Sequence, residues 1–375
     1  MSSRDLRTVG LFGGGRWGRV LVRVIRSLLA DDVAICWVTK ASQETSTDWI
    51  AKHQLANTIV RGEVTDYSTF DAAVVAQRPT QHFATVNKLL QSHVPTLCEK
   101  PLAVTLENTR DLVALANREQ TPLGVNLEFH YASYLDSLAD QLSKTKPTEI
   151  ELVWHDPWIE ERHGEIKRGA RYTSKAHDML PHCWSIIRRI VPDAAEATVE
   201  SVSYSPSETV LKFNYGDLAA TVSCSRRASQ RIRRVVAETV DSTTTIDFSI
   251  EPGHTIRQGV RKENQWTGAA GARPLGRSLG SFFDVVRSGG FDWPLAAHQC
   301  VGCFSLSDAA SKELIRDQDR QIQSHQKKGI NFDDPSQVAL VVDRYAPNVS
   351  DRIILDTPQQ LRAAAKDWLD HFADR

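Results

Sequence analysis

The chain of 375 residues is long enough for two domains, each with its own apolar core. Hydrophobic residues make up 41% of it and charged residues 24%, which is ordinary for a globular protein. The formal net charge of -1 gives no sign of a strongly basic surface, so we expect a small-molecule partner rather than nucleic acid or an acidic membrane.

Two further features of the sequence bear on location. No apolar run approaches the roughly 20 residues that span a bilayer, and the polar first residues are unlike a signal peptide. The six cysteines are spread through the chain, several of them inside apolar segments, as expected for reduced thiols rather than a disulfide framework. We therefore expect a cytoplasmic protein.

The first third of the chain alternates short apolar runs with segments of helical periodicity. Strands are expected at 8–12, 33–38, 71–76, 94–98 and 123–127, and helices at 19–29, 79–90 and 106–117. Because strands that alternate with helices join by right-handed crossovers, this order predicts a doubly wound parallel sheet, the Rossmann form of the α/β class.

The pattern changes after about residue 148, where strands follow one another with turn signals between them. They are expected at 149–154, 199–204, 209–215, 218–225, 235–239 and 244–250, with one long helix at 175–190 and a loop at 264–277. This predicts a second α/β domain with a large, mostly antiparallel, open sheet. We expect domains at 1–128 and 129–315, then an extension at 316–375 that ends in a helix.

The turn after the first strand is rich in glycine and reads Gly13-Gly14-Gly15-Arg16-Trp17-Gly18. Gly13 would allow a tight turn, Gly15 a close approach to a pyrophosphate, and Gly18 close packing of the next helix on the sheet. The amino terminus of that helix would offer free N–H groups and a positive potential to the phosphates. The alternative is a glycine-rich turn that binds nothing.

The end of the second strand bears on the choice of nucleotide. An NAD site usually places a carboxylate there, about 20 residues beyond the glycines, whereas this strand ends in Thr39 and Lys40. Asp31 and Asp32 precede the strand, at its wrong end. Because hydroxyl and ammonium groups can bind a 2′-phosphate, we expect NADP(H). The alternative is that Lys40 is an exposed loop lysine.

Four motifs together resemble those of the Gfo/Idh/MocA oxidoreductase family. They are the glycine motif, Arg78-Pro79-x-x-His82, Glu99-Lys100-Pro101, and an aspartate four residues before His182. The likeness covers about residues 7 to 315. It implies a Rossmann domain followed by a domain whose open sheet often forms an oligomer interface, hence a homodimer or homotetramer. It also implies hydride transfer between C4 of a nicotinamide and a substrate carbon, often in a sugar or cyclitol.

The resemblance also implies roles for single residues. Besides the glycines, the expected cofactor contacts are Phe12, Arg16, Trp17, Pro79, His82, Glu99 and Lys100. Lys100 would be the active-site lysine, and Asp178 and His182 would face the substrate from the second domain. A spacing of four puts Asp178 and His182 on one helical face. Histidine suits proton transfer near neutral pH, and a lysine can stabilise an alkoxide. The alternatives are an ion pair of Lys100 with Glu99, a core position for His182, and a helix-capping role for Asp178.

Two positions depart from the family pattern. Members often carry an arginine two residues after Asn126, where this chain has Glu128. A carboxylate there would favour a substrate with an amine or guanidine. Pro181 directly precedes His182 and could redirect the imidazole.

The segment between 154 and 182 is dense in polar residues, and we interpret it as part of the substrate cleft. Tyr172 and Lys175 are candidate contacts for substrate hydroxyl or carboxylate groups. His177 and His182 are five residues apart and do not share a helical face, so we expect no metal site. A basic cluster at 231–234 is interpreted as a solvated strand face.

Three classes of function stay open. The first is an NADP(H)-dependent oxidoreductase acting on a sugar, a cyclitol or a related carbonyl compound. The second is an imine or ketone reductase of a specialised natural-product pathway, which the altered position Glu128 favours slightly. The third is a non-catalytic NADP-binding regulator, and the presence of Lys100, Asp178 and His182 argues against it.

Overall fold

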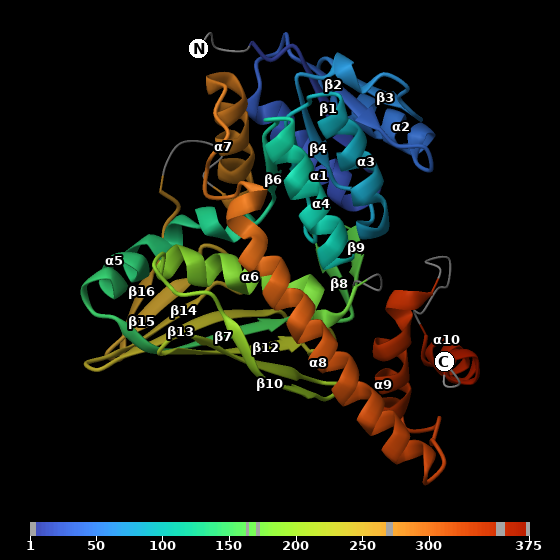
Figure 1. Cartoon of the computed structure of the whole chain (residues 1–375), viewed down its shortest axis with the longest axis vertical. Helices are drawn as coiled ribbons and strands as arrows, with labels where there is room; N and C mark the ends of the chain where they lie inside the picture. Colours follow the sequence, from blue (N-terminus) through green and yellow to red (C-terminus); the bar gives the residue numbers. More distant parts are fainter. Residues whose placement is uncertain (1–4, 163–164, 170–172, 268–272, 350–356, 373–375) are drawn as a thin grey trace. The chain divides into compact units, whose positions relative to one another are not determined.

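The computed structural model describes residues 5–162, 165–169, 173–267, 273–349 and 357–372 (Figure 1). Two compact units make up the chain. The first consists of Met1–Asp136 and Trp266–Phe304, and the second of Ser137–Gln265 and Ser305–Arg375. The division differs from the expected boundaries at 128 and 315, because 266–304 returns to the first unit and the carboxyl-terminal extension joins the second.

The first unit contains a six-stranded parallel sheet, as the sequence predicted, in the order β3-β2-β1-β4-β5-β6. Its strands are Thr8–Phe12 (β1), Ala34–Val38 (β2), Thr58–Arg61 (β3), Ala72–Val75 (β4), Thr96–Cys98 (β5) and Leu123–Val125 (β6). Apart from the edge strand β3, these strands are almost entirely buried, which explains why they read as continuous apolar runs. β3 is half-exposed and has no continuous apolar run that would predict it.

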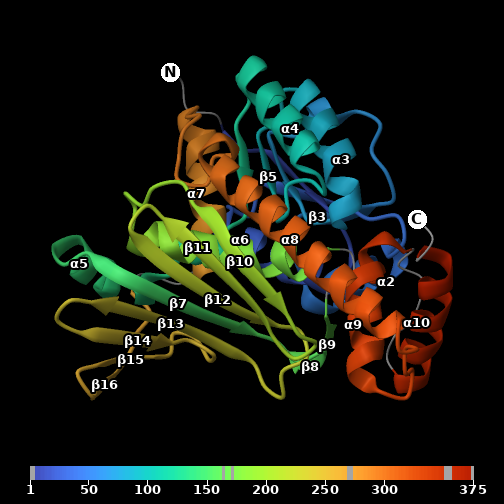
Figure 2. The same cartoon turned by 60° about the horizontal axis from the view of Figure 1, so that its bottom comes forward.

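Helices cover both faces of this sheet. They are Gly15–Leu28 (α1), Gln43–His53 (α2), Pro79–Gln91 (α3), Leu106–Arg118 (α4) and Pro274–Ser288 (α7). α3 packs against α4, as Figure 2 shows, and α1 packs against α7. The returning segment also extends the sheet, because the N–H of Val125 donates to the carbonyl of Leu295 at 3.0 Å. The loop expected at 264–277 therefore stops earlier, since α7 begins at Pro274.

The second unit contains an eight-stranded sheet in the order β10-β11-β12-β7-β13-β14-β15-β16. Its strands are Pro147–His155 (β7), Thr198–Tyr204 (β10), Thr209–Tyr215 (β11), Leu218–Ser225 (β12), Ile232–Thr239 (β13), Thr243–Asp247 (β14), His254–Arg257 (β15) and Val260–Glu263 (β16). Only β12 and β7 pair in parallel, so the sheet is mostly antiparallel, as predicted. Lys175–Ile190 (α6) packs on β7 and β12.

Smaller elements complete the two units. Ile159–Arg162 (β8) and Glu165–Arg168 (β9) form a separate hairpin, and Asp136–Lys144 (α5) precedes β7. The extension contains the end of Val301–Gln326 (α8), then Pro335–Tyr345 (α9) and Pro358–Phe372 (α10). α9 and α10 pack together, and the rings of Tyr345 and Phe372 stack at 5.4 Å. None of the helices in the described ranges is long and apolar enough to span a membrane.

The basic cluster at 231–234 is not a uniformly solvated face. The side chain of Arg233 is 2% exposed and forms an ion pair with Asp156 at 2.6 Å. Its neighbour Arg234 is 44% exposed and lies 3.7 Å from Asp247. The interpretation of this cluster as a solvated strand face was therefore wrong for Arg233, because strand alternation turns successive side chains to opposite faces of β13.

These two arginines form a matched pair for a test of stability. We expect Arg233→Ala to lower the free energy of unfolding by about 3–5 kcal/mol, because it leaves the carboxylate of Asp156 desolvated without its main counter-ion. We expect Arg234→Ala to change it by no more than about 0.5 kcal/mol. Urea unfolding of both variants measures the difference, and equal losses would contradict the assignment of Arg233 to a structural ion pair.

Candidate functional site

The glycine turn has the backbone and the close contacts that the motif predicts. Gly13 has a φ of 129°, and a Cβ placed on it would lie 2.4 Å from the carbonyl oxygen of Ala76. A Cβ on Gly18 would lie 2.4 Å from the carbonyl oxygen of Gly13. These positions need glycine because β1, the turn and α1 are packed against one another. A Cβ on Gly14 would likewise lie 2.3 Å from the hydroxyl oxygen of Thr39.

Gly15 differs from the other glycines of the turn. Its φ is 77°, its surroundings are open, and a Cβ there would have no neighbouring atom within 4 Å in the described structure. It is the first residue of α1, whose amino terminus has no side-chain cap and no acidic residue in the first turn. By contrast, Thr105 caps α4 and Ser174 caps α6. The start of α1 therefore fits an anionic group such as a dinucleotide pyrophosphate.

Two aromatic side chains hold this turn in place. The indole N–H of Trp37 donates to the carbonyl of Gly13 at 2.7 Å, and Trp37 is fully buried. The ring of Phe12 is 2% exposed and stacks on Tyr67 at 5.7 Å. Phe12, expected to contact the cofactor, therefore places its side chain in the core.

The carboxylate of Glu99 joins the first turn of α1 to the end of β6. It accepts hydrogen bonds from the indole N–H of Trp17 at 2.8 Å and from the amide of Asn126 at 2.6 Å. The amide oxygen of Asn126 accepts in turn from the hydroxyl of Ser278 at 2.7 Å. Burial raises the pKa of Glu99, and the hydrogen bonds from Asn126 and Trp17 oppose that rise. This network links α1, the ends of β5 and β6, and α7.

His82 supports the turn that carries Lys100. Its Nδ1 lies 2.8 Å from the carbonyl oxygen of Pro101, and its Nε2 lies 3.0 Å from that of Gln77. The side chain is 1% exposed, and burial lowers its pKa. His82 therefore positions the Lys100–Pro101 turn, whose peptide bond is cis, and its ring is shielded from a ligand. The structure thus brings the motif that begins at Arg78 against the motif that ends at Pro101.

The remaining predicted residues of the first unit follow the carboxyl ends of parallel strands, the edge where ligands bind in such sheets. Thr39 and Lys40 follow β2, and Lys100 follows β5 by two residues. Thr39 is 7% exposed and donates to the hydroxyl of Ser42 at 3.4 Å, whereas Lys40 is exposed.

Glu128 begins the short helix Glu128–Tyr131 (η2) beyond β6 and is half-buried. Arg16 and Trp17 in α1 and Pro79 at the start of α3 are also half-buried.

In the second unit, α6 runs through Pro181 as one continuous helix and carries Asp178 and His182. Its cap is Ser174, whose hydroxyl accepts from the N–H of His177 at 3.2 Å, so Asp178 is not the capping residue. Instead, the carboxylate of Asp178 forms an ion pair with Arg226 at 3.1 Å. The same guanidinium donates to the carbonyl of Ser174 at 3.0 Å.

His182 lies against an aromatic ring of the sheet. Its imidazole stacks on Trp154 with ring centroids 4.8 Å apart and an interplanar angle of 14°. The guanidinium of Arg233 lies 3.9 Å from the centroid of the same indole. Burial lowers the pKa of Arg233 to about 10, while Asp156 opposes this shift. Trp154 and Arg233 therefore fix the surroundings of His182, and no motif indicated either role.

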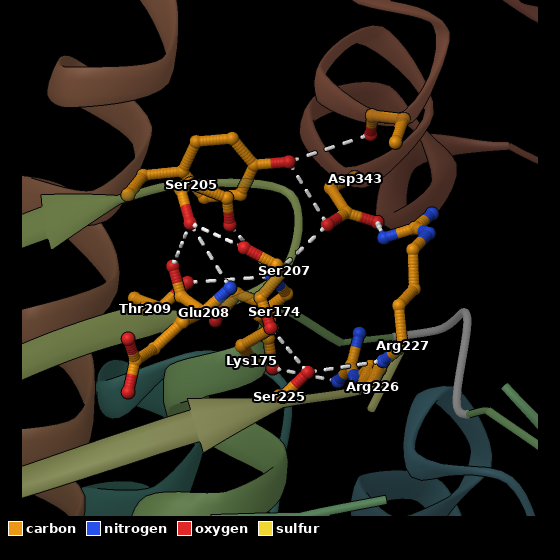
Figure 3. Close-up of polar contacts among 12 residues, drawn as sticks. Ser174, Lys175, Ser205, Ser207, Glu208, Thr209, Ser225, Arg226, Arg227 and Asp343 are labelled. Atoms are coloured by element: carbon orange, nitrogen blue, oxygen red, sulfur yellow. Dashed lines mark hydrogen bonds and ion pairs between the residues drawn. The ribbon is translucent and has the colours of Figure 1, made fainter. Parts of the chain in front are cut away.

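Lys175 and Tyr172 are the two other residues that the sequence suggested as substrate contacts. The ammonium of Lys175 is 2% exposed and forms an ion pair with Asp343 at 3.2 Å (Figure 3). The ammonium of this substrate candidate is therefore already paired within the protein. Tyr172 lies outside the described residues. In the described part of the chain, no three His, Cys, Asp or Glu side chains form a group that could hold a metal ion.

The fold and the first half of the site define a dinucleotide-binding Rossmann domain joined to a second α/β domain. Residues 7–127 match a family model described as an oxidoreductase family with an NAD-binding Rossmann fold. This match covers the amino-terminal third of the chain and agrees with the resemblance to the Gfo/Idh/MocA oxidoreductase family drawn from its motifs.

Known proteins extend the comparison. Over 129 residues the chain is 33% identical to a myo-inositol dehydrogenase of Streptomyces leeuwenhoekii, a match that covers 33% of this chain and 37% of that enzyme. The fold resembles a Gfo/Idh/MocA family oxidoreductase from Vibrio cholerae (TM-score 0.66, 14% identity, 83% of this chain and 99% of that one). It also resembles a 3-ketoreductase from Actinomadura kijaniata solved with TDP-benzene and NADP (TM-score 0.65, 14% identity, 81% of this chain and 96% of that one).

Gly15 and Gly289 allow a controlled test of the phosphate site. Both have positive φ, 77° and 65°, and open space where a Cβ would lie. We expect either alanine variant to lower the free energy of unfolding by about 1 kcal/mol, because both impose a left-handed backbone on alanine. Only Gly15→Ala should weaken binding of NAD(H) or NADP(H), by about tenfold or more, because its methyl group occupies the space that a phosphate needs.

Titration of the two variants with reduced cofactor, followed by nicotinamide fluorescence, measures this difference. If Gly15→Ala binds as tightly as Gly289→Ala, the start of α1 is not the phosphate site.

Proposed function

We propose that the protein is an NADP(H)-dependent oxidoreductase that transfers a hydride between nicotinamide C4 and a carbon of a sugar, a cyclitol or a related carbonyl compound. The observation that carries this proposal is the hydrogen bond between Trp17 and Glu99. It joins the helix with the open amino terminus to the turn that presents Lys100. This hydrogen bond therefore connects the proposed phosphate site to the lysine that lies next to the proposed nicotinamide site.

The bound cofactor would supply the hydride chemistry, and the protein the positioning and the protons. In this proposal the start of α1 holds the pyrophosphate, and Lys100 hydrogen-bonds the reacting oxygen of the substrate and stabilises negative charge on it. His182 gives or takes the hydroxyl proton. Asp178, held by Arg226, accepts a hydrogen bond from a neighbouring substrate hydroxyl.

The choice of NADP(H) rests on the residues that follow β2. Between Val38 and Ser42 there is no carboxylate to hydrogen-bond a ribose and repel a 2′-phosphate. The hydroxyls of Thr39 and Ser42 lie 3.4 Å apart. Lys40, which directly follows Thr39 in the chain, is exposed. Two hydroxyls and a cation suit a dianionic phosphate.

A second candidate is reduction of an imine or ketone in a natural-product pathway. It is favoured by Glu128, a half-buried carboxylate just beyond β6 that could pair with an amine on the substrate. Turnover of NADPH with ketoses, inososes and cyclic imines separates the two candidates. Unchanged discrimination between amino and neutral substrates by Glu128→Gln would remove this role of Glu128. A non-catalytic regulator would show no turnover with any of them.

The partners of the chain follow from the same proposal. They are a small-molecule substrate and, through the exposed face of the eight-stranded sheet, a second copy of the chain in a homodimer or homotetramer. A cytoplasmic location agrees with six reduced cysteines, all of which are buried in the structure.

Cofactor preference is tested with Lys40. We expect the wild type to prefer NADPH over NADH, and Lys40→Ala to raise the KM for NADPH by about 10- to 100-fold, because it removes a charged hydrogen bond to the phosphate. The KM for NADH should stay unchanged. Lys52→Ala, which removes an exposed lysine in the last turn of α2, is the control and should alter neither value. A strong NADH preference of the wild type would overturn the assignment.

The catalytic assignment is tested with Lys100 and His182. We expect Lys100→Ala and His182→Asn each to lower kcat by about 10²- to 10⁴-fold, the usual range for a lost proton-transfer or charge-stabilising group. NADPH binding by His182→Asn should remain, since the expected cofactor contacts lie in the first unit. Steady-state kinetics combined with NADPH titration measures both effects. Unchanged turnover by either variant removes that residue from the mechanism.

A further inference from the structure

The carboxyl-terminal extension supplies a buried carboxylate to the second unit. Asp343 of α9 is 5% exposed and contacts three side chains from other elements (Figure 3). Its oxygens lie 3.2 Å from the ammonium of Lys175 and 2.6 Å from the guanidinium of Arg227, and one accepts from the hydroxyl of Tyr204 at 3.0 Å. Although burial opposes ionisation, Arg227 and Lys175 lower the pKa of Asp343 to about 2. Asp343 is therefore a fixed negative charge at neutral pH.

The cations that Asp343 binds belong to the segments that hold Asp178. Lys175 is the first residue of α6, three residues before Asp178, and Arg227 directly follows Arg226. Arg226 bonds both to Asp178 and to the carbonyl of Ser174, the residue before Lys175, so these groups lie close together. Within this cluster Asp343 forms ion pairs with Lys175 and Arg227, and Arg226 is bonded to Asp178.

The first turn of α6 is held from three sides. Asp343 binds it through Lys175, and Arg226 donates to the carbonyls of Thr173 and Ser174 at 3.0 Å each. The hydroxyl of Ser311 in α8 donates to that of Ser174 at 2.8 Å. One turn beyond this anchored end is Asp178, and one turn further is His182. Movement of the anchored turn would displace both side chains.

We propose that Asp343 is a positioning residue for the reaction, so that the carboxyl-terminal segment completes the substrate half of the site. It fixes the first turn of α6 and keeps Lys175 and Arg227 from competing with Arg226 for Asp178. This inference rests on the proposed function, because it gives Asp178 and His182 their catalytic roles. It adds a residue from the extension, which none of the sequence motifs had included.

The test uses Asp343→Asn, which removes the charge with little change in shape. The matched control is Asp319→Asn, because Asp319 of α8 forms the neighbouring ion pair to α9, with Arg344 at 2.6 Å. We expect Asp343→Asn to lower kcat by about 100-fold, the scale of a misplacement of about 1 Å, with the KM for NADPH unchanged. Asp319→Asn should stay within about twofold of the wild type in both values.

A charge-balanced variant keeps the test valid if Asp343→Asn does not fold. Arg227→Met combined with Asp343→Asn removes one cation together with the carboxylate and leaves Lys175 a hydrogen-bond partner at position 343, so we expect its kcat to stay within about tenfold of the wild type. No loss of kcat in Asp343→Asn, an equal loss in Asp319→Asn, or a loss of more than about tenfold in the double variant would overturn the positioning role.

Hydrogen exchange separates this inference from the proposed function, because it needs neither substrate nor turnover. Amides at 176–179 should exchange at least about tenfold faster in Asp343→Asn than in the wild type and in Asp319→Asn. If the wild type turns over no substrate but this difference is found, the proposed function fails and the anchoring of α6 stands. If exchange is the same in all three proteins, the anchoring itself is wrong.

Discussion

The carboxylate of Glu99 is the group on which the first half of the site depends. A desolvated carboxylate is costly unless it is hydrogen-bonded, and here the indole of Trp17 and the amide of Asn126 both donate to it. These two bonds tie the first turn of α1 to the ends of β5 and β6, and Ser278 extends the tie to α7. Since Lys100 is the next residue in the chain, its backbone position follows from the same bonds.

In the second unit, buried ion pairs hold the candidate site residues in position. Asp156 with Arg233 sets the surroundings of Trp154, on which His182 stacks, and Asp343 pairs with Lys175 in the first turn of α6. Such pairs add little net stability relative to apolar packing, but breaking one leaves a desolvated charge. Their value here is that they allow few alternative positions for α6 and the side chains that it carries.

Much of the architecture could be predicted from the sequence. Buried parallel strands are continuous apolar runs, and α6 begins and ends at the residues that its periodicity indicated. The edge strand β3 and the mostly exposed α2 have weak patterns and were not predicted. The return of 266–304 to the first unit could not be predicted either, because it depends on packing between segments far apart in the sequence.

The sequence motifs predicted which residues the site would contain better than they predicted what each residue does there. The glycines are needed for the reasons the motif gives, but Phe12 and His82 turned out to serve the core and the Lys100 turn. The partners that decide such roles are distant in sequence, as Trp17 and Glu99 are, 82 residues apart. No local pattern could show that Lys175 is bound by Asp343.

We propose hydride transfer by a protein that binds NADP(H) at the start of α1. Incubation of the protein with NADPH carrying two deuterium atoms at C4 and a panel of ketoses and inososes, followed by mass spectrometry of the products, tests it most directly. Hydride transfer predicts a product alcohol with one deuterium on the newly formed carbinol carbon. Oxidation of the cofactor without deuterium in any product, or no binding of NADPH at all, would contradict it.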